Sequence, residues 1–275
     1  MRRLKPTPRR ASGFASLGSG SRGNGTLVAI GGSLFLVDCG FPLKQAEARL
    51  GRLGVRPGDL TAVLVTHEHS DHASGVPDLT HKYGLPVYAS NGTFKAVGHE
   101  LIGHTVHGDQ PFDVNGVTIM PVTVPHDARE SVQFVFYHAN LKIGVVSDLG
   151  CVTPHVIDQY SGCDGILMES NHDREMLMRG RYPIRLKRRI ASDLGHLSND
   201  QARDFLTAIA HPRLEVVVGH VSAQNNHSDL LRRTFAQFDT SVACLSFATQ
   251  QDGCGWTHFA DSSGSSIPVA FGHAV

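Results

Sequence analysis

The sequence predicts an α/β protein in which two β-sheets pack face to face and helices cover both outer sides, a four-layer αββα sandwich. Three observations support this prediction. Short apolar runs rich in β-branched residues alternate with amphipathic segments in both halves of the chain. The 275 residues are 41% hydrophobic, enough for one large core. No linker or low-complexity stretch divides them, so we expect one domain over residues 12–275.

The first half of the chain is expected to pass from strands to alternating helices and strands. Its strands are short and apolar, and they are expected at 14–17, 26–30, 33–40 and 61–65. The glycine pair at 31–32 is typical of a two-residue hairpin turn. Helical periodicity is expected at 42–53 and at 70–83, where Ser70 or Asp71 opens the helix.

The second half repeats this alternation. Further strands are expected at 111–114, 117–122, 132–137, 141–146, 165–169 and 214–218. Asn115-Gly116 is a strong hairpin signal between the first two of them. Helices are expected near 91–98, 199–210 and 225–238. Two such halves suggest the two packed sheets.

Composition limits where the protein acts. Residues 1–11 are basic with no apolar stretch behind them, which predicts a flexible tail rather than a secretory signal. No apolar run approaches the ~20 residues of a membrane span. The five cysteines are scattered without a C-x-x-C pair, as expected for reduced thiols in the cytoplasm. The net charge is zero, so nucleic-acid binding would have to depend on local basic patches.

The glycine-rich segment 18–25 lies between the first two expected strands. It formally contains G-x-G-x-x-G, but a dinucleotide-binding loop opens a helix, and this segment leads into a strand. We therefore exclude dinucleotide binding. Two interpretations stay open, a tight hairpin turn and a loop whose backbone N–H groups and Arg22 hold a phosphate.

The segment Thr66 to His72 carries the densest chemistry of the chain. Three histidines and two carboxylates follow directly after the buried strand 61–65. His67 and His69 alternate on an extended turn, so both can face one cation, whereas Glu68 between them points away. Imidazole and carboxylate ligands suit zinc, manganese or iron. Asp38, at the end of another strand, is expected to support this loop.

The segment reads H-x-H-x-D-H and resembles the signature of the metallo-β-lactamase fold superfamily, which has the αββα architecture. A zincin would need histidine at position 71, and the flavodiiron pattern would need glutamate at position 69, so hydrolytic chemistry is expected. The resemblance implies two divalent metal ions, with manganese or zinc first and iron as a further candidate. It assigns the ligands as His67, His69 and His126 on one ion, Asp71, His72 and His220 on the other, and Asp148 between them. His126, Asp148 and His220 each follow an expected strand.

Two further residues resemble catalytic positions of the superfamily's transfer-RNA 3′-processing nucleases. Glu169 ends a strand, and His196 precedes a helix within Gly195-His196-Leu197-Ser198. We interpret His196 as a general acid or phosphate ligand, oriented by Glu169 or His172. The predicted catalytic residues are thus Asp71, His196 and Glu169.

The glycine-rich segment, 195–199 and 219–226 together are similar to the YycJ/WalJ-type metallo-hydrolases, regarded as 5′-to-3′ DNA exonucleases. The resemblance extends from about residue 13 to about residue 257, although position 221 is valine where leucine is usual. It leaves the residues after Ala260 unplaced. We expect phosphate contacts from the short polar side chains and the arginine of these loops, namely Ser19, Ser21, Arg22, Asn24 and Ser222.

Seven cations fall in the segment from Arg174 to Arg189, which lies between Glu169 and His196 in the sequence. They predict a basic loop that neutralises the phosphates of a bound strand, and a solvated helix face is the alternative. The residues expected to contact nucleic acid are Arg181, Arg185, Lys187, Arg188 and Arg189. Tyr182 is a candidate for stacking on a base.

Two functions compete. The first is a metal-dependent phosphodiesterase or nuclease, a 5′-to-3′ DNA exonuclease that uses a metal-activated water, with DNA as partner and RNA as second candidate. The second is a small-molecule hydrolase on the same fold, such as a cyclic phosphodiesterase, lactonase or thioesterase, which predicts an apolar pocket. A non-enzymatic metal scaffold is disfavoured because none of the seven ligands is missing. The sequence does not specify the oligomeric state.

Overall fold

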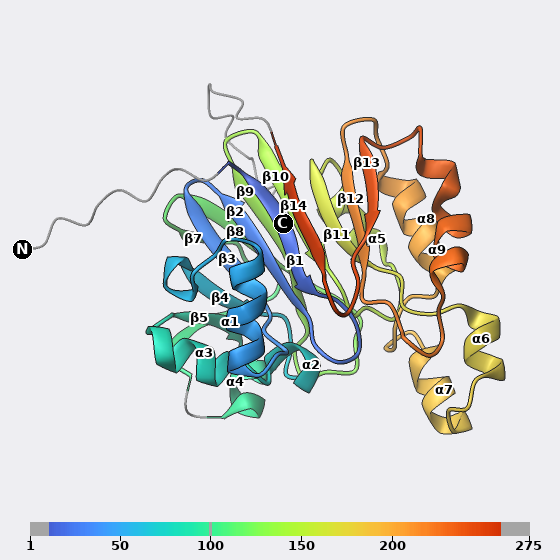
Figure 1. The fold of residues 1–275 in the computed structure, drawn as a ribbon, viewed down its shortest axis with the longest axis horizontal. Helices are drawn as coiled ribbons and strands as arrows, with labels where there is room; N and C mark the ends of the chain where they lie inside the picture. Colours follow the sequence, from blue (N-terminus) through green and yellow to red (C-terminus); the bar gives the residue numbers. More distant parts are fainter. Residues whose placement is uncertain (1–10, 99–100, 260–275) are drawn as a thin grey trace, which may run out of the picture.

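The computed structural model describes residues 11–98 and 101–259; the expectations for the basic tail up to residue 10 and for the residues after Ala260 lie outside them. Within this part of the chain, two seven-stranded sheets face one another and helices cover their outer faces, which confirms the predicted αββα sandwich (Figure 1). The first sheet has the order β14-β1-β2-β3-β4-β5-β6, and the second has the order β13-β12-β11-β10-β9-β8-β7.

The strands of the first sheet are β1 (Gly13–Gly18), β2 (Gly25–Ile30), β3 (Ser33–Val37), β4 (Ala62–Val65), β5 (Val87–Ser90), β6 (Gly103–Val106) and β14 (Cys254–His258). Those of the second are β7 (Phe112–Val114), β8 (Val117–Thr123), β9 (Val132–His138), β10 (Leu141–Val146), β11 (Gly165–Glu169), β12 (Glu215–Gly219) and β13 (Cys244–Phe247). The helices are α1 (Leu43–Arg52), α2 (Ser70–Ala73), α3 (Val76–Tyr83), α4 (Asn91–Val97), α5 (Pro154–Tyr160), α6 (Arg174–Arg179), α7 (Ile184–Ile190), α8 (Asn199–Ile209) and α9 (Ser228–Phe235), with short 3₁₀ turns at Pro57–Asp59 and Ala236–Phe238.

Side-chain alternation along the strands builds the layers. Successive strand residues point to opposite faces of a sheet. On β2, Leu27 packs outward under the helices of the first half, whereas Val28 packs inward between the sheets. On β11, Ile166 faces the helices of the second half and Leu167 faces the inner layer. Three hydrophobic layers therefore hold the four structural layers together.

The helix expected at 70–83 is broken into two pieces. The helical hydrogen-bond pattern stops at Gly75, whose N–H donates to the carbonyl of Cys39 at 2.8 Å. A Cβ at position 75 would lie 1.9 Å from the carbonyl oxygen of Phe41, so only glycine allows this close approach. His69, not Ser70 or Asp71, is the residue that precedes the first helical turn. The helix is thus broken by a contact with a segment distant in the chain, which the periodicity of the sequence does not reveal.

Other segments also differ from the expectation. The helix expected at 225–238 begins only at Ser228, because Asn225 and Asn226 turn inward to make buried hydrogen bonds. Strands β6, β13 and β14 and helix α5 were not predicted. The segment expected to be a basic loop is a pair of short helices, α6 and α7, which we call the α6–α7 arm (residues 174–190).

The direction of the strands places the predicted site residues at one edge of the two sheets. Strands β3, β4 and β5 are mutually parallel, as are β10, β11 and β12, and β8 runs parallel to β10 because each is antiparallel to β9. The carboxyl ends of parallel strands meet at the same edge. The α6–α7 arm projects from this end of the molecule (Figure 1). No helix of the described residues is long and apolar enough to cross a membrane.

Candidate metal centre

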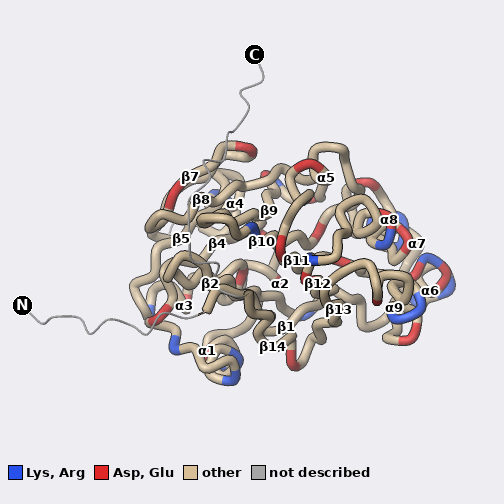
Figure 2. The backbone as a smooth tube through the Cα atoms, turned by 90° about the horizontal axis from the view of Figure 1, so that it is seen from above, with Lys and Arg blue, Asp and Glu red and all other residues tan. Residues whose placement is uncertain are grey.

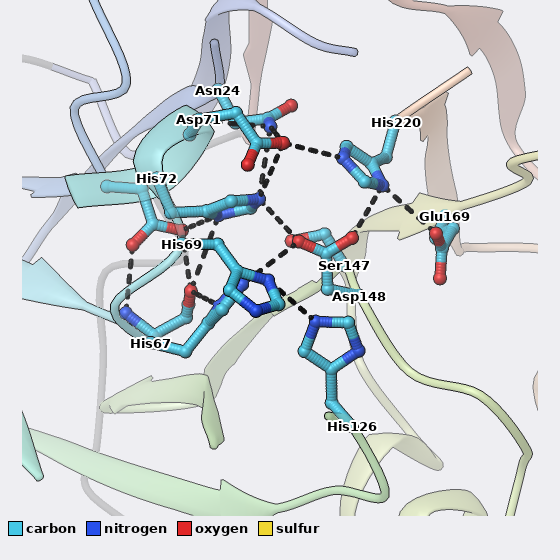
Figure 3. A network of polar contacts seen from close by, with 12 residues as sticks. Asn24, His67, His69, Asp71, His72, His126, Ser147, Asp148, Glu169 and His220 are labelled. Carbon is cyan, nitrogen blue, oxygen red and sulfur yellow. Dashed lines mark hydrogen bonds and ion pairs between the residues drawn. The ribbon is translucent and has the colours of Figure 1, made fainter. Parts of the chain in front are cut away.

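The first group of candidate ligands is formed by His67, His69 and His126, on the turn after β4 and the loop after β8. Their ligand atoms lie within 4.8 Å of one another. His126 Nε2 is 3.2 Å from His69 Nδ1, and the rings of His67 and His126 meet edge to face at 4.8 Å (Figure 3). The structure thus brings together the three side chains that the sequence assigned to one ion.

The second group comprises Asp71, His72, Asp148 and His220, again within 4.8 Å of one another. His220 Nδ1 lies 2.7 Å from Asp148 Oδ1, and its Nε2 lies 3.5 Å from Asp71 Oδ2. Asp148 Oδ2 contacts His72 Nε2 and lies 3.5 Å from His67 Nε2 (Figure 3). One carboxylate therefore faces both groups, which is the placement the resemblance implied for Asp148.

Hydrogen bonds on the far side of the rings orient the histidines. His72 Nδ1 donates to Asp38 Oδ2 at 2.8 Å, and His126 Nδ1 donates to the carbonyl of Gly195 at 3.1 Å. Thr66 donates its hydroxyl to Asp38, so its oxygen accepts from His67 Nδ1 at 2.9 Å. With Nδ1 protonated, each ring presents the lone pair of Nε2 to the centre, as metal-binding histidines do. Asp38 supports the loop as expected.

Glu169 and His196 join the same cluster. His196 Nδ1 lies 2.8 Å from Glu169 Oε1 and 3.0 Å from Asp148 Oδ1, and Glu169 also contacts His220 Nδ1 at 3.0 Å. These four residues form a third group of ligand atoms within 4.8 Å. Of the two residues proposed to orient His196, Glu169 makes the contact, whereas His172 Nδ1 has no hydrogen-bond partner.

The charges of the cluster indicate a cation-binding site. Burial alone would raise the pKa of the Asp148 carboxyl, but His220 and His72 hold it well below its usual range. Burial would lower the pKa of His220, but Asp148 raises it well above the ordinary value. Burial lowers the pKa of His67, so that ring stays neutral. Buried His67 Nε2 and His220 Nε2 have no hydrogen-bond partner. Unpaired imidazole nitrogens beside buried carboxylates fit divalent cations.

The centre opens into a polar cavity of about 310 Å³. Its lining consists of Ser21, His69, Ser70, Asp71, Asp148, Arg189, His196 and His220. Arg189 is held there by Asp127, with Nη2 donating to Oδ1 at 3.1 Å. Asp127 Oδ1 in turn lies 3.7 Å from His126 Nε2. Sequence reasoning missed Asp127, because its only signal is adjacency to His126 and its partner lies 62 residues away.

The glycine-rich segment does not offer the free backbone that phosphate binding would need. The amides of Ser19, Gly20, Arg22 and Asn24 donate to protein acceptors, and Gly23 closes the turn onto Gly20. The segment is a tight turn packed against the β13–β14 connection, which favours the first of the two interpretations.

Three of the predicted phosphate contacts are buried and serve other purposes. Ser19 Oγ accepts the amide of His220 at 2.6 Å, and Asn24 Nδ2 donates to Asp71 Oδ2 at 3.3 Å. Ser222 Oγ accepts the amide of Asn225 at 3.2 Å. These side chains hold the site from behind, so their assignment to phosphate is corrected. Ser21 and Arg22 are exposed, and Ser21 lines the cavity.

The predicted basic residues lie on the α6–α7 arm and its connection. Figure 2 shows lysine and arginine gathered along these two helices. Arg181, Arg185 and Arg188 are exposed. Lys187 Nζ donates to the carbonyl of Met178 at 2.6 Å and ties the two helices together. Arg189 alone among them lines the cavity.

Comparisons with known proteins agree with this geometry. Residues 34–220 match the model of the β-lactamase superfamily domain. The exodeoxyribonuclease YycJ of Bacillus anthracis is 38% identical over 82% of this chain and 88% of that protein. The exodeoxyribonuclease WalJ of Streptococcus pneumoniae is 34% identical over 83% of this chain and 90% of its own.

Solved structures share the fold at low identity. The metallo-β-lactamase fold protein YhfI from Bacillus subtilis has a TM-score of 0.67 at 17% identity, covering 88% of this chain and 98% of its own. A diphosphatase from the PhnP family has a TM-score of 0.65 at 18% identity, covering 91% and 98%. With two sheets, a histidine-aspartate cluster at their shared edge and the matched family model, the chain belongs to the β-lactamase superfamily.

Proposed function

We propose that the protein is a metal-dependent nuclease that degrades DNA from a 5′ end in the cytoplasm. The observation that carries this proposal is the joining of two metal-ligand groups through Asp148 on the wall of a polar cavity that Arg189 also lines. Such a cavity presents cationic and hydrogen-bonding groups to a phosphodiester, which suits phosphoryl transfer better than an uncharged substrate.

The ligand set fits two divalent cations, manganese or zinc, with iron as a further candidate. His67, His69 and His126 would hold one ion, Asp71, His72 and His220 the other, and Asp148 would bridge them. Such ions supply Lewis-acid chemistry, acidifying a water and neutralising charge on the phosphate. Asn24 keeps Asp71 in place through Oδ2.

His196 is suited to protonate the leaving oxygen of the cleaved strand. Burial would lower its pKa, but the carboxylates of Glu169 and Asp148 raise the pKa to about 9, so the imidazole carries a proton at neutral pH. Nδ1 is engaged by these carboxylates, which leaves the Nε2 proton for the substrate. Glu169 is entirely buried and acts as a positioning residue.

DNA as substrate is supported by the two exodeoxyribonucleases with which this chain shares most of its length. Degradation from the 5′ end is carried over from the YycJ/WalJ resemblance, and RNA is the second candidate polymer. The α6–α7 arm would neutralise phosphates beside the site through exposed arginines such as Arg185 and Arg188. A small-molecule hydrolase is expected to have an apolar pocket, but every residue lining this cavity is polar.

The test is turnover of 5′-labelled single- and double-stranded DNA and RNA by metal-stripped protein supplied with manganese, zinc or magnesium. We expect degradation of DNA that requires an added metal and disappears in Asp71→Ala. The product ladder then reports the polarity. Hydrolysis of a lactone or thioester with no cleavage of any nucleic acid under any metal would refute the proposal.

A further inference from the structure

A second cavity of about 230 Å³ lies behind the loop that carries His196. It is lined by residues of the β11–α6 loop, of α6, of the segment after α7 and of α8, namely His172, Arg174, Leu177, Met178, Ala191 and Gln201. The two cavities lie close together: Arg189 lines the first and Ala191, two residues later, lines the second, and His172 of the second interacts electrostatically with His196 of the first. A group bound there would therefore sit next to the proposed reaction site.

The lining of this cavity combines apolar walls with polar groups. Leu177, Met178 and Ala191 provide the apolar part, and a methionine sulfur packs well against aromatic rings. Arg174 Nε donates to Ser198 Oγ at 3.2 Å, which fixes the plane of the guanidinium. Planar guanidinium groups stack on bases. The cavity is smaller than the roughly 300–1,000 Å³ of drug-sized sites, so it suits one ring system rather than a whole nucleotide.

His172 supplies an unmatched hydrogen-bonding atom. The side chain is 1% exposed, it lines the cavity, and its Nδ1 has no hydrogen-bond partner. A buried polar atom without a partner is unfavourable, and a ligand in the cavity could satisfy Nδ1 only after the ring turns toward it. Burial lowers the pKa of His172 to about 4, so the ring is neutral at physiological pH and matches the edge of a base better than a phosphate.

The surface around the cavity is unusually apolar for a basic segment. Four large apolar side chains stand out as exposed in the described residues, and three of them, Met178, Ile184 and Leu194, belong to the arm and the loop after it, at 55%, 56% and 51% exposed. Exposed apolar groups that lie together mark a binding surface, and the cations beside them suit a strand whose phosphates and bases are both contacted.

We propose that this cavity binds the nucleobase of a nucleotide that flanks the cleaved phosphodiester, between the α6–α7 arm and the N-terminus of α8. The proposal rests on the proposed nuclease function. The protein would then recognise an unstacked base at a single-strand end. His172 would face the edge of the base, and Met178 and Arg174 would contact its flat faces. An abasic nucleotide at that position would then be a poor substrate.

The first test uses single-stranded DNA carrying one abasic residue at successive positions from the 5′ end. We expect one position at which the abasic residue lowers kcat/KM about 10-fold, as expected from the stacking of one base. Ala191→Trp fills the cavity and should abolish that sensitivity, and Met178→Ala should weaken it. Ile102→Ala is the control, because this residue is also exposed and apolar but lies outside the arm and lines neither cavity.

The second test observes binding without turnover. In full-length protein labelled with [methyl-¹³C]methionine, thymidine 5′-monophosphate should shift the Met178 signal but not that of buried Met120, and Ala191→Trp should remove the shift. An equal shift with inorganic phosphate alone would overturn the inference in favour of an anion site. Absence of any Met178 shift would also overturn it.

The two proposals fail in different ways. DNA degradation that tolerates an abasic residue at every position would refute the base site and leave the nuclease function standing. Absence of all nuclease activity would refute the proposed function, and the methionine titration would still decide whether the cavity accepts a base.

Discussion

Replacing Asp38 with asparagine should weaken metal binding without touching a predicted ligand. The carboxylate is 3% exposed and accepts three hydrogen bonds of 2.8 Å, from the amide and hydroxyl of Thr66 and from His72 Nδ1. Asparagine keeps one acceptor oxygen for the Thr66 amide, but its NH₂ group would face the N–H of His72. The His72 ring must then change tautomer, which moves the lone pair away from the centre.

The magnitude follows from the loss of one hydrogen bond to a charged group, about 1.5–3 kcal/mol. This corresponds to a decrease of about 10- to 100-fold in metal affinity, the usual effect of removing a partner of a ligand histidine. The backbone should not contribute, because asparagine tolerates the left-handed conformation of position 38, where φ is 61°.

Competition with a chromophoric chelator would measure zinc and manganese affinity, and circular dichroism would verify the fold. Asp113→Asn is the matched control, since this exposed carboxylate accepts only the amide of Gly116, at 2.9 Å, in the β7–β8 hairpin. If folded Asp38→Asn bound both metals as tightly as Asp113→Asn, the reasoning about the His72 tautomer would be wrong.

Three further results are expected. His196→Ala should lower kcat on DNA by about 100-fold or more, yet spare bis(p-nitrophenyl) phosphate, whose phenolate leaves without a proton; equal losses on both substrates would exclude the role as acid. Replacing Arg185 and Arg188 with alanine should reduce the slope of log K for single-strand binding against log salt concentration by about 1.4. An unchanged slope would show that the arm does not contact the strand. Burial raises the pKa of Cys39 to about 12, so iodoacetamide at about pH 8 should leave Cys39 intact and alkylate exposed Cys244, as peptide mapping would show.

The layers and the gathering of the candidate site could be predicted because both depend on local patterns. Short continuous apolar runs define strands such as β2 and β11, and polar residues that directly follow parallel strands meet at one edge. The resemblance supplied the ligand set, and this reasoning explains why His126 and His220 lie at the same edge as His67 although they are far apart in the chain. The structure brings together all seven predicted ligand residues.

Burial and long-range packing could not be predicted in the same way. Ser19, Asn24 and Ser222 are short polar residues of the kind that contact phosphate, and only the fold shows that each is buried against the site loops. The break at Gly75 depends on carbonyls more than thirty residues away. The dense cations of the α6–α7 arm led us to expect a loop, although arginine, lysine and leucine are all good helix formers. Arg189 differs from the other cations of the arm by its position in the fold, not by its charge.

The feature that the sequence predicts least is the left-handed backbone at three strand ends around the candidate metal centre. Asp38, Asp148 and His220 follow β3, β10 and β12, and each has a left-handed backbone, with φ of 61°, 50° and 49°. Glycine is the usual residue for such a conformation, and other residues there cost of order 1–3 kcal/mol each. Glycine would remove the side chains that converge on the centre. Hydrogen bonds hold two of these residues in this conformation: the Thr66 amide donates to Asp38, and the His220 amide donates to Ser19 Oγ. Bound cations would offset the cost at these three strand ends, because ions that bind only the folded protein stabilise it.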